Sequence, residues 1–131
     1  MPEPLVVQLA KQLRDAYNSY LADQPQTLGL FTDDVVYRDP RFPAFRGKEA
    51  LKGYLKQLAG ENQALQVKWE FVTIIAEGQQ AAVEWVVKTA LDVGGKRFEF
   101  PGAAFFKMRE GKISSYCGYW DTGILQQLST E

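Results

Sequence analysis

Hydrophobic residues near the start of the chain recur at every third or fourth position over residues 3–23. This spacing predicts an amphipathic helix with one apolar stripe, ending before Pro25. A short second helix is expected over 27–31, and a longer one over 47–58, for which Gly60 is the natural stop. The two stripes consist of Val6, Leu9, Leu13, Tyr17 and Tyr20, and of Ala50, Leu51, Tyr54, Leu55 and Leu58.

After Gly60 the hydrophobic period changes from helical to two, which is typical of half-buried strands. A short strand over 34–39 precedes this part, and the turn sequences EGQQ, DVGGK and REGK separate the later strands. The dipeptide Pro101-Gly102 predicts a bulge or bend, and residues 122–128 a short terminal helix or tail. The long strands are predicted over 65–75, 81–91, 98–108 and 113–120.

The order of these elements, helices first and long strands afterwards, predicts an α+β fold. We expect the N-terminal helices to pack on one face of a curved antiparallel sheet. The chain has 131 residues, without an internal repeat or a low-complexity linker. A single domain over residues 1–131 is therefore expected.

Composition narrows the classes of function. The net charge is −1 and no basic stripe is visible, so a nucleic acid is not an expected partner. No apolar run resembles a signal peptide or is long enough to cross a membrane, and no internal disulfide is possible with Cys117 as the single cysteine. These features predict a cytoplasmic protein that does not engage a membrane.

The complete absence of histidine restricts the chemistry further. It excludes Ser-His-Asp and Cys-His sites and removes the commonest metal ligand. Acid–base chemistry would have to come from carboxylates, tyrosine, lysine or Cys117, and neither a metal nor a cofactor is expected.

Asp39, in the segment VYRDP, is the first candidate catalytic residue. Period two places it on the same side of its strand as Val35 and Tyr37, facing the expected interior. Carboxylates in apolar pockets have raised pKa values and exchange protons near neutral pH. Alternatively, Asp39 accepts backbone N–H groups in the loop made by Pro40, or pairs with an arginine. The arginines within reach in the sequence are Arg38, Arg41 and Arg46.

Tyr17, on the inward stripe of the first helix, is the second candidate. A buried tyrosine needs a partner for its hydroxyl group, which a ligand oxygen, a water or Asp39 would supply. A tyrosine of the core would need the same partner for purely structural reasons. The sequence leaves both interpretations open.

The chain resembles the nuclear transport factor 2-like superfamily over nearly its whole length. The resemblance rests on the amphipathic first helix, then LFTDDVVYRDP, FRGKEAL and a final hairpin ending in GKISSYCGYWD. It implies a cone-shaped fold, in which helices cover the concave side of a strongly bent sheet and leave a pocket between them. It also implies a homodimer, because many relatives pair. The superfamily contains both enzymes and non-enzymes.

Among the enzymes of this superfamily, ketosteroid isomerase is the most similar locally. The resemblance makes Asp39 the counterpart of its general base and Tyr17 that of its oxyanion tyrosine. The second acid of the isomerase falls at Ala104, which cannot donate a hydrogen bond. Loss of one such donor typically costs about 100- to 1000-fold in rate.

SnoaL-like polyketide cyclases and limonene epoxide hydrolases are also similar. Their aspartate in the last strand corresponds to Gly118, and the Arg and Asp of the hydrolase to Trp85 and Val87. Asp121 comes later and closes the strand. The small-molecule reactions of these relatives are thus not directly transferable.

The resemblance also implies a lining for a pocket that takes a small hydrophobic molecule. The small residues among the lining would leave volume free, although large rings could equally fill the core. Phe42 and Phe45 would cap the opening or bury in a dimer contact, whereas Glu84 and Cys117 alternate to the other face. The expected lining residues are Tyr37, Tyr54, Trp85, Val87, Thr89, Ala104, Phe106, Tyr116, Gly118 and Trp120.

Three hypotheses follow. The first is a cofactor-independent enzyme of isomerase or cyclase type, with Asp39 as proton shuttle and Tyr17 as hydrogen-bond donor. The second is a non-catalytic module that binds a ligand in the same pocket. The third is an interaction protein that pairs through the outer sheet face, where charged residues alternate with apolar ones. Those charged residues are Lys68, Glu70, Glu84 and Lys88.

Overall fold

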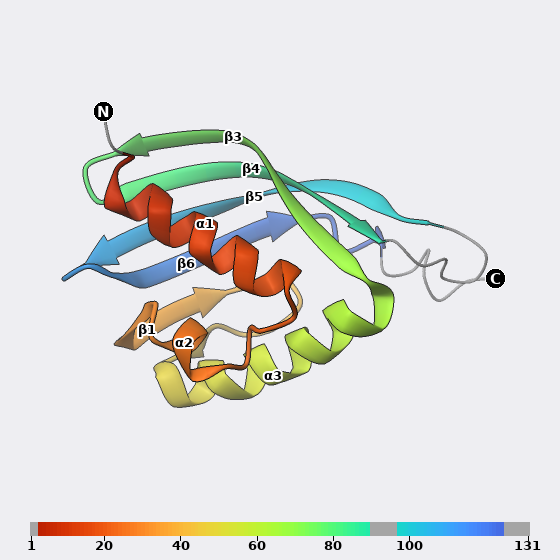
Figure 1. Cartoon of the computed structure of the whole chain (residues 1–131), viewed down its shortest axis with the longest axis horizontal. Helices are drawn as coiled ribbons and strands as arrows, with labels where there is room; N and C mark the ends of the chain where they lie inside the picture. The colour runs from red at the N-terminus through yellow and green to blue at the C-terminus, as the bar shows by residue number, and fades with distance from the viewer. Residues whose placement is uncertain (1–2, 90–96, 125–131) are drawn as a thin grey trace.

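The computed structural model describes residues 3–89 and 97–124 (Figure 1). Three helices and six strands make up this part of the chain. The helices are α1 (Leu5–Asn18), α2 (Pro25–Leu28) and α3 (Lys48–Leu65). The strands are β1 (Phe31–Arg38), β2 (Phe45–Arg46), β3 (Val67–Glu77), β4 (Gln80–Thr89), β5 (Glu99–Arg109) and β6 (Lys112–Trp120).

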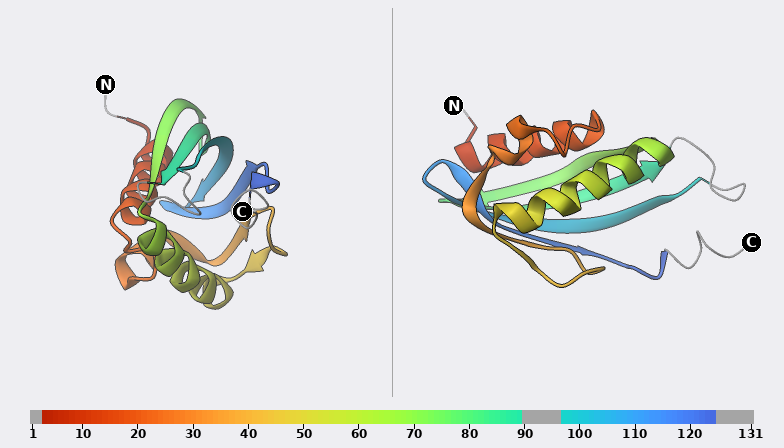
Figure 2. Two further views of the ribbon diagram at one scale, coloured as in Figure 1. Left: turned by 90° about the vertical axis from the view of Figure 1, so that its right-hand side faces the viewer. Right: turned by 90° about the horizontal axis from the view of Figure 1, so that it is seen from below.

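The strands form one sheet in the order β2-β1-β6-β5-β4-β3. The sheet bends strongly, and Figure 2 shows α1 and α3 on its concave side. This arrangement confirms the α+β cone fold. The sheet is mixed, however, because β1 runs parallel to β6, with Tyr37 opposite Tyr116, while the other neighbours are antiparallel. Wholly antiparallel pairing was therefore a wrong expectation: α3 and the β3–β5 meander lie between β1 and β6 in the sequence, so no hairpin joins them.

The helix boundaries differ from the predicted ones for local reasons. Helix α1 ends at Asn18, because Tyr20 adopts a left-handed conformation with φ 60° that no helix continues. Helix α2 begins at Pro25, a residue favoured in the first turn, and ends before Phe31 starts β1. Helix α3 runs through Gly60 to a left-handed cap at Gln66. A helix tolerates such a glycine at about 1 kcal/mol relative to alanine when its apolar face continues.

Strand β3 contains an irregularity that sequence alternation alone did not predict. Its pairing with β4 shifts between Phe71 and Thr73. As a result Thr73 and Ile75 lie on the exposed side, and Ile74 packs against the core. By contrast, the bulge expected at Pro101-Gly102 is absent, because β4 and β5 pair regularly through both residues.

Two predicted features lie outside the described residues. One is the end of the second long strand with the DVGGK turn, over 90–96. The other is most of the terminal segment, over 125–131.

One end of the concave face is solidly packed. Helix α1 lies across this end (Figure 1), and its apolar stripe joins the inward residues of the strands in one core cluster. The most deeply buried side chains include Phe31, Phe106 and Ile113, each with no exposed surface. Close packing of this kind fixes the side chains that lie at the border between the packed end and the rest of the concave face.

Candidate functional site

A cavity of about 400 Å³ lies at the other end of the concave face, between the sheet and α3. This volume falls within the range of small-molecule sites. Most side chains on its wall are aromatic or aliphatic, and a few polar groups converge among them. Among the described residues the wall consists of Tyr17, Asn18, Tyr37, Asp39, Arg41, Tyr54, Leu58, Glu61, Asn62, Ala64, Leu65, Val67, Trp69, Trp85, Val87, Thr89, Phe98, Phe100, Tyr116 and Trp120.

A cluster of buried tyrosines separates the cavity from the packed end. The hydroxyl groups of Tyr17 and Tyr37 lie 2.7 Å apart and share a hydrogen bond. Tyr37 stacks on Tyr116 with ring centroids 4.2 Å apart, and Tyr116 meets the edge of Phe106. Burial raises the pKa of Tyr17, Tyr37 and Tyr116 well above the usual value, so all three are neutral hydroxyl groups at neutral pH.

Asn18 fixes the end of α1 that carries Tyr17. Its side-chain amide accepts from the backbone N–H of Trp69 at 2.7 Å and donates to the carbonyl oxygen of Trp69 at 3.0 Å. Since β3 is an edge strand, these two groups of Trp69 lack a further strand to pair with. The side chain of Asn18 therefore acts as a strand partner, and Tyr17 stacks on the Trp69 ring at 5.2 Å.

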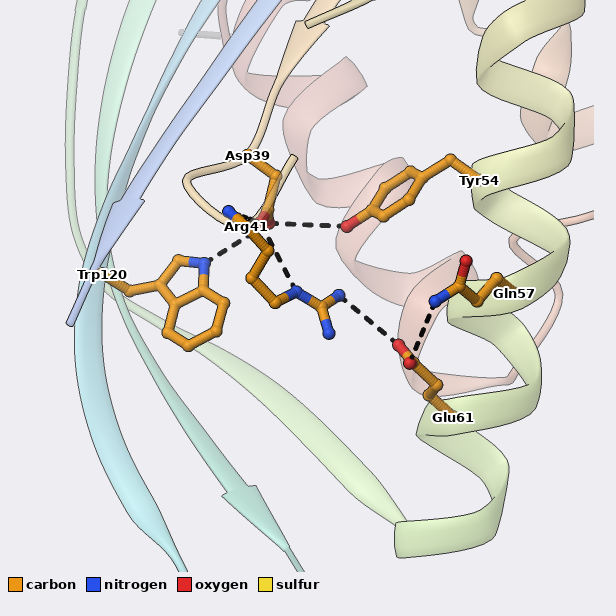
Figure 3. A network of polar contacts seen from close by, with 6 residues as sticks. All are labelled: Asp39, Arg41, Tyr54, Gln57, Glu61 and Trp120. Carbon is orange, nitrogen blue, oxygen red and sulfur yellow. Dashed lines mark hydrogen bonds and ion pairs between the residues drawn. The ribbon is translucent and has the colours of Figure 1, made fainter. Parts of the chain in front are cut away.

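Asp39 projects from the end of β1 onto the cavity wall, as the two-residue period predicts (Figure 3). Its side chain is 12% exposed. One oxygen, Oδ1, accepts the backbone N–H of Arg41 at 2.9 Å and lies 3.6 Å from Arg41 Nε. The other, Oδ2, has longer contacts, 3.4 Å from the Tyr54 hydroxyl group and 3.3 Å from Trp120 Nε1.

The structural alternative that the sequence left open for Asp39 is observed at one of its two oxygens. Oδ1 has the structural role, closing the turn at Pro40 and facing an arginine, which is Arg41 and not the exposed Arg38 or Arg46. The Tyr54 contact of Oδ2 is well above the usual length of about 2.7–2.8 Å for an O–H···O bond, and the Trp120 contact is somewhat longer than the usual length of about 2.9–3.0 Å for an N–H···O bond. A ligand group could therefore compete for Oδ2.

Arg41 links this turn to α3. Its guanidinium lies 3.4 Å from Glu61, which Gln57 also contacts (Figure 3). The guanidinium carbon lies 4.9 Å from the centre of the Phe42 ring. The Nε atom of Arg41 is buried and has no hydrogen-bond partner within 3.5 Å among the described residues. The polar side of the cavity therefore holds one cation between two carboxylates.

Nine of the predicted site residues come together on the wall, whereas three lie elsewhere. Ala104, Phe106 and Gly118 do not line the cavity and are buried in the packed end. The Tyr116 ring reaches within 3.2 Å of the point where a Cβ of Gly118 would lie, so the missing side chain leaves no free volume. The nine are Tyr17, Tyr37, Asp39, Tyr54, Trp85, Val87, Thr89, Tyr116 and Trp120.

Sequence reasoning missed several wall residues. Glu61 and Leu65 were missed because the helix was expected to stop at Gly60. Trp69 and Phe100 alternate inward on β3 and β5, so their two-residue period was a signal that could have identified them.

The predicted wall residue Trp85 packs against Gly102, and its buried Nε1 has no hydrogen-bond partner among the described residues.

Metal-binding clusters and membrane-spanning helices are both absent from the described residues. No group of three or more acidic, cysteine or histidine residues is arranged to hold a metal ion within 3–89 and 97–124. No helix in the same part of the chain combines the length and the apolar character needed to cross a bilayer.

The bent sheet and its covering helices form the fold of the nuclear transport factor 2-like superfamily. Within this superfamily the chain belongs to the SnoaL-like domain family, which residues 10–116 match. No curated protein matches the sequence.

Several solved structures share the fold at low sequence identity. A candidate polyketide cyclase from Xanthomonas campestris pv. campestris is 20% identical, with 95% of each chain covered and a TM-score of 0.71. TerC, crystallised with polyporic acid, is 15% identical, with 95% of this chain and 98% of that chain covered and a TM-score of 0.77. A hypothetical protein of ketosteroid isomerase-like fold from Catenulispora acidiphila, in complex with trimethylamine, is 18% identical, with 94% and 93% covered and a TM-score of 0.75.

Proposed function

We propose that the protein binds a small, largely apolar molecule in this cavity and transfers a proton within it, with Asp39 as the base. The observation that carries the proposal is the position of Asp39 Oδ2, on the wall of an aromatic cavity with only long contacts. The reaction class is proton abstraction next to a carbonyl group, as in isomerisation or cyclisation, without a cofactor. Membership of the SnoaL-like family and the cyclase-type neighbour support this class.

In this proposal the affinity for the ligand comes mainly from burial of its apolar surface. The cavity wall presents rings from both the sheet and the helices, and small ligands are bound mainly by burial of apolar surface. Two neighbours were crystallised with small molecules, polyporic acid and trimethylamine, in the same fold.

Tyr17 has the role of hydrogen-bond donor, through the hydroxyl pair it forms with Tyr37. A single hydrogen bond joins the two oxygens and uses one of their two hydrogens. The second hydrogen is available to Tyr116 or to a ligand oxygen, whichever tyrosine carries it. Because burial keeps the pKa of both groups high, neither loses this hydrogen at neutral pH.

Deuterium exchange of 2-tetralone tests the base directly, because this small aromatic ketone has acidic hydrogens next to its carbonyl group. Binding is followed by the fluorescence of the three tryptophans, all of which line the cavity. Exchange is followed in heavy water by proton NMR. Asp39→Asn is expected to bind 2-tetralone and to lose about 100-fold or more of the exchange rate, the usual contribution of a general base.

Asp33→Asn is the matched control, since Asp33 lies on the same strand with a side chain that is 99% exposed. It should exchange at the wild-type rate. Equal exchange by Asp39→Asn and wild type, at equal occupancy, would rule out Asp39 as the base.

A non-catalytic binding module is the second candidate function. It is favoured by Ala104, which is fully buried at the packed end where the isomerase-like resemblance expects a second acid. In this case 2-tetralone would bind to the wild-type protein without any exchange above that in buffer.

We further propose a homodimer through the outer face of the sheet. Large hydrophobic side chains are exposed there, including Ile75 at 67% and Phe105 at 48%, which lie in one row across β3, β4 and β5. Light scattering after size exclusion would measure it, and a monomer at micromolar concentration contradicts it. The cytoplasmic location likewise stays a prediction.

A further inference from the structure

Arg41 is the only cationic side chain on the described part of the cavity wall. Its side chain is 18% exposed and its guanidinium lies over the Phe42 and Trp120 rings, 4.9 and 5.7 Å from their centres. These cation–π contacts hold the guanidinium at the cavity wall.

Arg41 interacts with the Tyr54 hydroxyl group, but its contacts to carboxylates are all long. A guanidinium carries five N–H groups, and charge-assisted bonds are normally about 2.7–2.9 Å long. Here the contacts to carboxylates are 3.4 Å to Glu61 and 3.6 Å to Asp39, and Nε has no hydrogen bond within the described residues. A buried donor of this kind gains free energy when a ligand oxygen reaches it.

We propose that Arg41 receives the negatively charged oxygen that forms on the ligand, in place of the acid that is missing at position 104. The inference rests on the proposed function in that Asp39 removes the proton. It assigns an oxyanion subsite to the loop after β1, and it selects ligands whose ketone or enol oxygen lies close to the hydrogen that is removed.

The charge balance of the step explains why Arg41 suits this role. A C–H bond next to the carbonyl group breaks, and its proton bonds to Asp39 Oδ2. The electron pair forms the double bond of an enolate, and the negative charge moves to the ligand oxygen. The charge leaves a carboxylate beside Arg41 and arrives on an oxygen beside Arg41, so the same cation compensates both states.

Glu61 is the remaining charged group beside Arg41, and it limits how far Arg41 can compensate the negative charge on the ligand oxygen. It lies on α3 with a side chain that is 40% exposed, and it keeps one side of the guanidinium occupied. The other ionisable groups on the described wall are tyrosine hydroxyls, including Tyr54, whose pKa is raised by burial and by Asp39. They can donate hydrogen bonds but carry no positive charge.

Binding of 2-naphthol and its fluorinated analogues tests the inference without turnover. These probes share a shape, but their acidity rises with fluorination. The test uses Asp39→Asn, which imitates the neutral, protonated base, and calorimetry measures each affinity. The most acidic probe should bind about tenfold more tightly than 2-naphthol, because a bond to a charged group is worth about that factor. Wild type should show a weaker preference, since the Asp39 charge opposes the probe.

Asp39→Asn/Arg41→Gln should bind all probes alike, whereas Asp39→Asn/Arg38→Gln should keep the preference, because Arg38 is exposed and does not line the cavity. Naphthalene, which has no oxygen, reports whether each variant still has a cavity. If Asp39→Asn/Arg41→Gln no longer binds naphthalene, the test uses Asp39→Asn/Arg41→Lys in its place. A preserved preference of this Lys variant for the most acidic probe supports the inference. An unchanged preference without Arg41, or a lost one in a Lys variant that binds naphthalene, would overturn it.

The two proposals fail separately. Loss of 2-tetralone exchange in Asp39→Asn concerns only the base, and the dependence of probe affinity on Arg41 concerns only the subsite.

Discussion

The two ends of the concave sheet face carry the same alternating pattern of hydrophobic residues, yet one end is solid and the other is hollow. At the solid end, Phe106 and Ala104 on β5 are fully buried in one core cluster with the apolar stripe of α1. At the hollow end, Phe100 on the same strand faces the cavity below α3. The alternation determines which side of a strand points inward, and the placement of the helices decides whether that side is covered closely.

The difference between the two ends also determines where polar, potentially reactive side chains can lie. Polar groups are costly inside a packed core unless they are paired. The tyrosine hydroxyls, Asp39 and Arg41 therefore gather at the border of the packed end or on the cavity wall, where they have one another as partners. A base or an oxyanion group at position 104 would have no free volume around it.

The largest expected difference between the two ends concerns stability. Phe106→Ala should lower the free energy of unfolding by about 3–5 kcal/mol, the usual effect of removing a fully buried phenylalanine. Phe100→Ala, on the same strand and face, should cost clearly less, about 1–2 kcal/mol, because part of its surface already faces the cavity. Urea unfolding of both variants measures the difference, and equal losses would mean that the hollow end is packed as closely as the solid one.

A smaller effect is expected from filling the hollow end. In Gly102→Ala the added Cβ would lie 2.3 Å from the Trp85 ring and 2.7 Å from the backbone oxygen of Tyr119, so the ring and the neighbouring strand β6 both have to shift. Overpacking of this kind typically costs about 1–3 kcal/mol. Since Trp85 lines the cavity, the affinity for naphthalene should fall as well, which calorimetry measures.

Gly60→Ala is the control for this substitution. Gly60 is an exposed residue of α3, and an added Cβ would meet nothing within 4 Å. The control should raise stability by about 0.5–1 kcal/mol and leave the affinity unchanged. Unaltered naphthalene binding in Gly102→Ala would mean that Trp85 does not shape the site.

The smallest effect concerns pH, at the border between the two ends. Burial raises the pKa of Tyr116 in the folded state, so the unfolded chain loses this proton first, near the usual value of about 10. The contribution to stability is present below that pH and is lost as the pH rises above it. Between about pH 9 and pH 11, wild type should lose about 1 kcal/mol more stability than Tyr116→Phe. Parallel losses in urea unfolding would indicate a solvated Tyr116.

Much of the architecture could be predicted from periodicity, because helices and strands differ in how often they turn a side chain inward. The inward position of Asp39 followed from its spacing to Val35 and Tyr37, and the structure places it on the cavity wall. Periodicity fails at single irregularities. The shift after Phe71 exchanged Thr73 and Ile74 between faces, and the passage of α3 through Gly60 brought Glu61 to the site.

Periodicity could not predict which parts of the interior are filled or which side chains meet there. Ala104 and Gly118 suggested free volume, but Ala104 is fully buried and the Tyr116 ring lies against Gly118. The partner of Asp39 also depended on loop geometry, since a hydrogen bond to the backbone of Arg41 selects that arginine over its neighbours in the sequence. Such contacts join segments whose distance in space the sequence does not give.

The position of a bound ligand tests the central claim most directly. Intermolecular nuclear Overhauser effects between 2-tetralone and the labelled protein would locate it. We predict contacts to Trp85, Phe100 and Trp120 around Asp39, and none to Phe106 or to the exposed Phe105 and Tyr119. Contacts confined to Phe105 and Tyr119 would contradict the account, because the ligand would then lie on the outer face of the sheet and away from the acid.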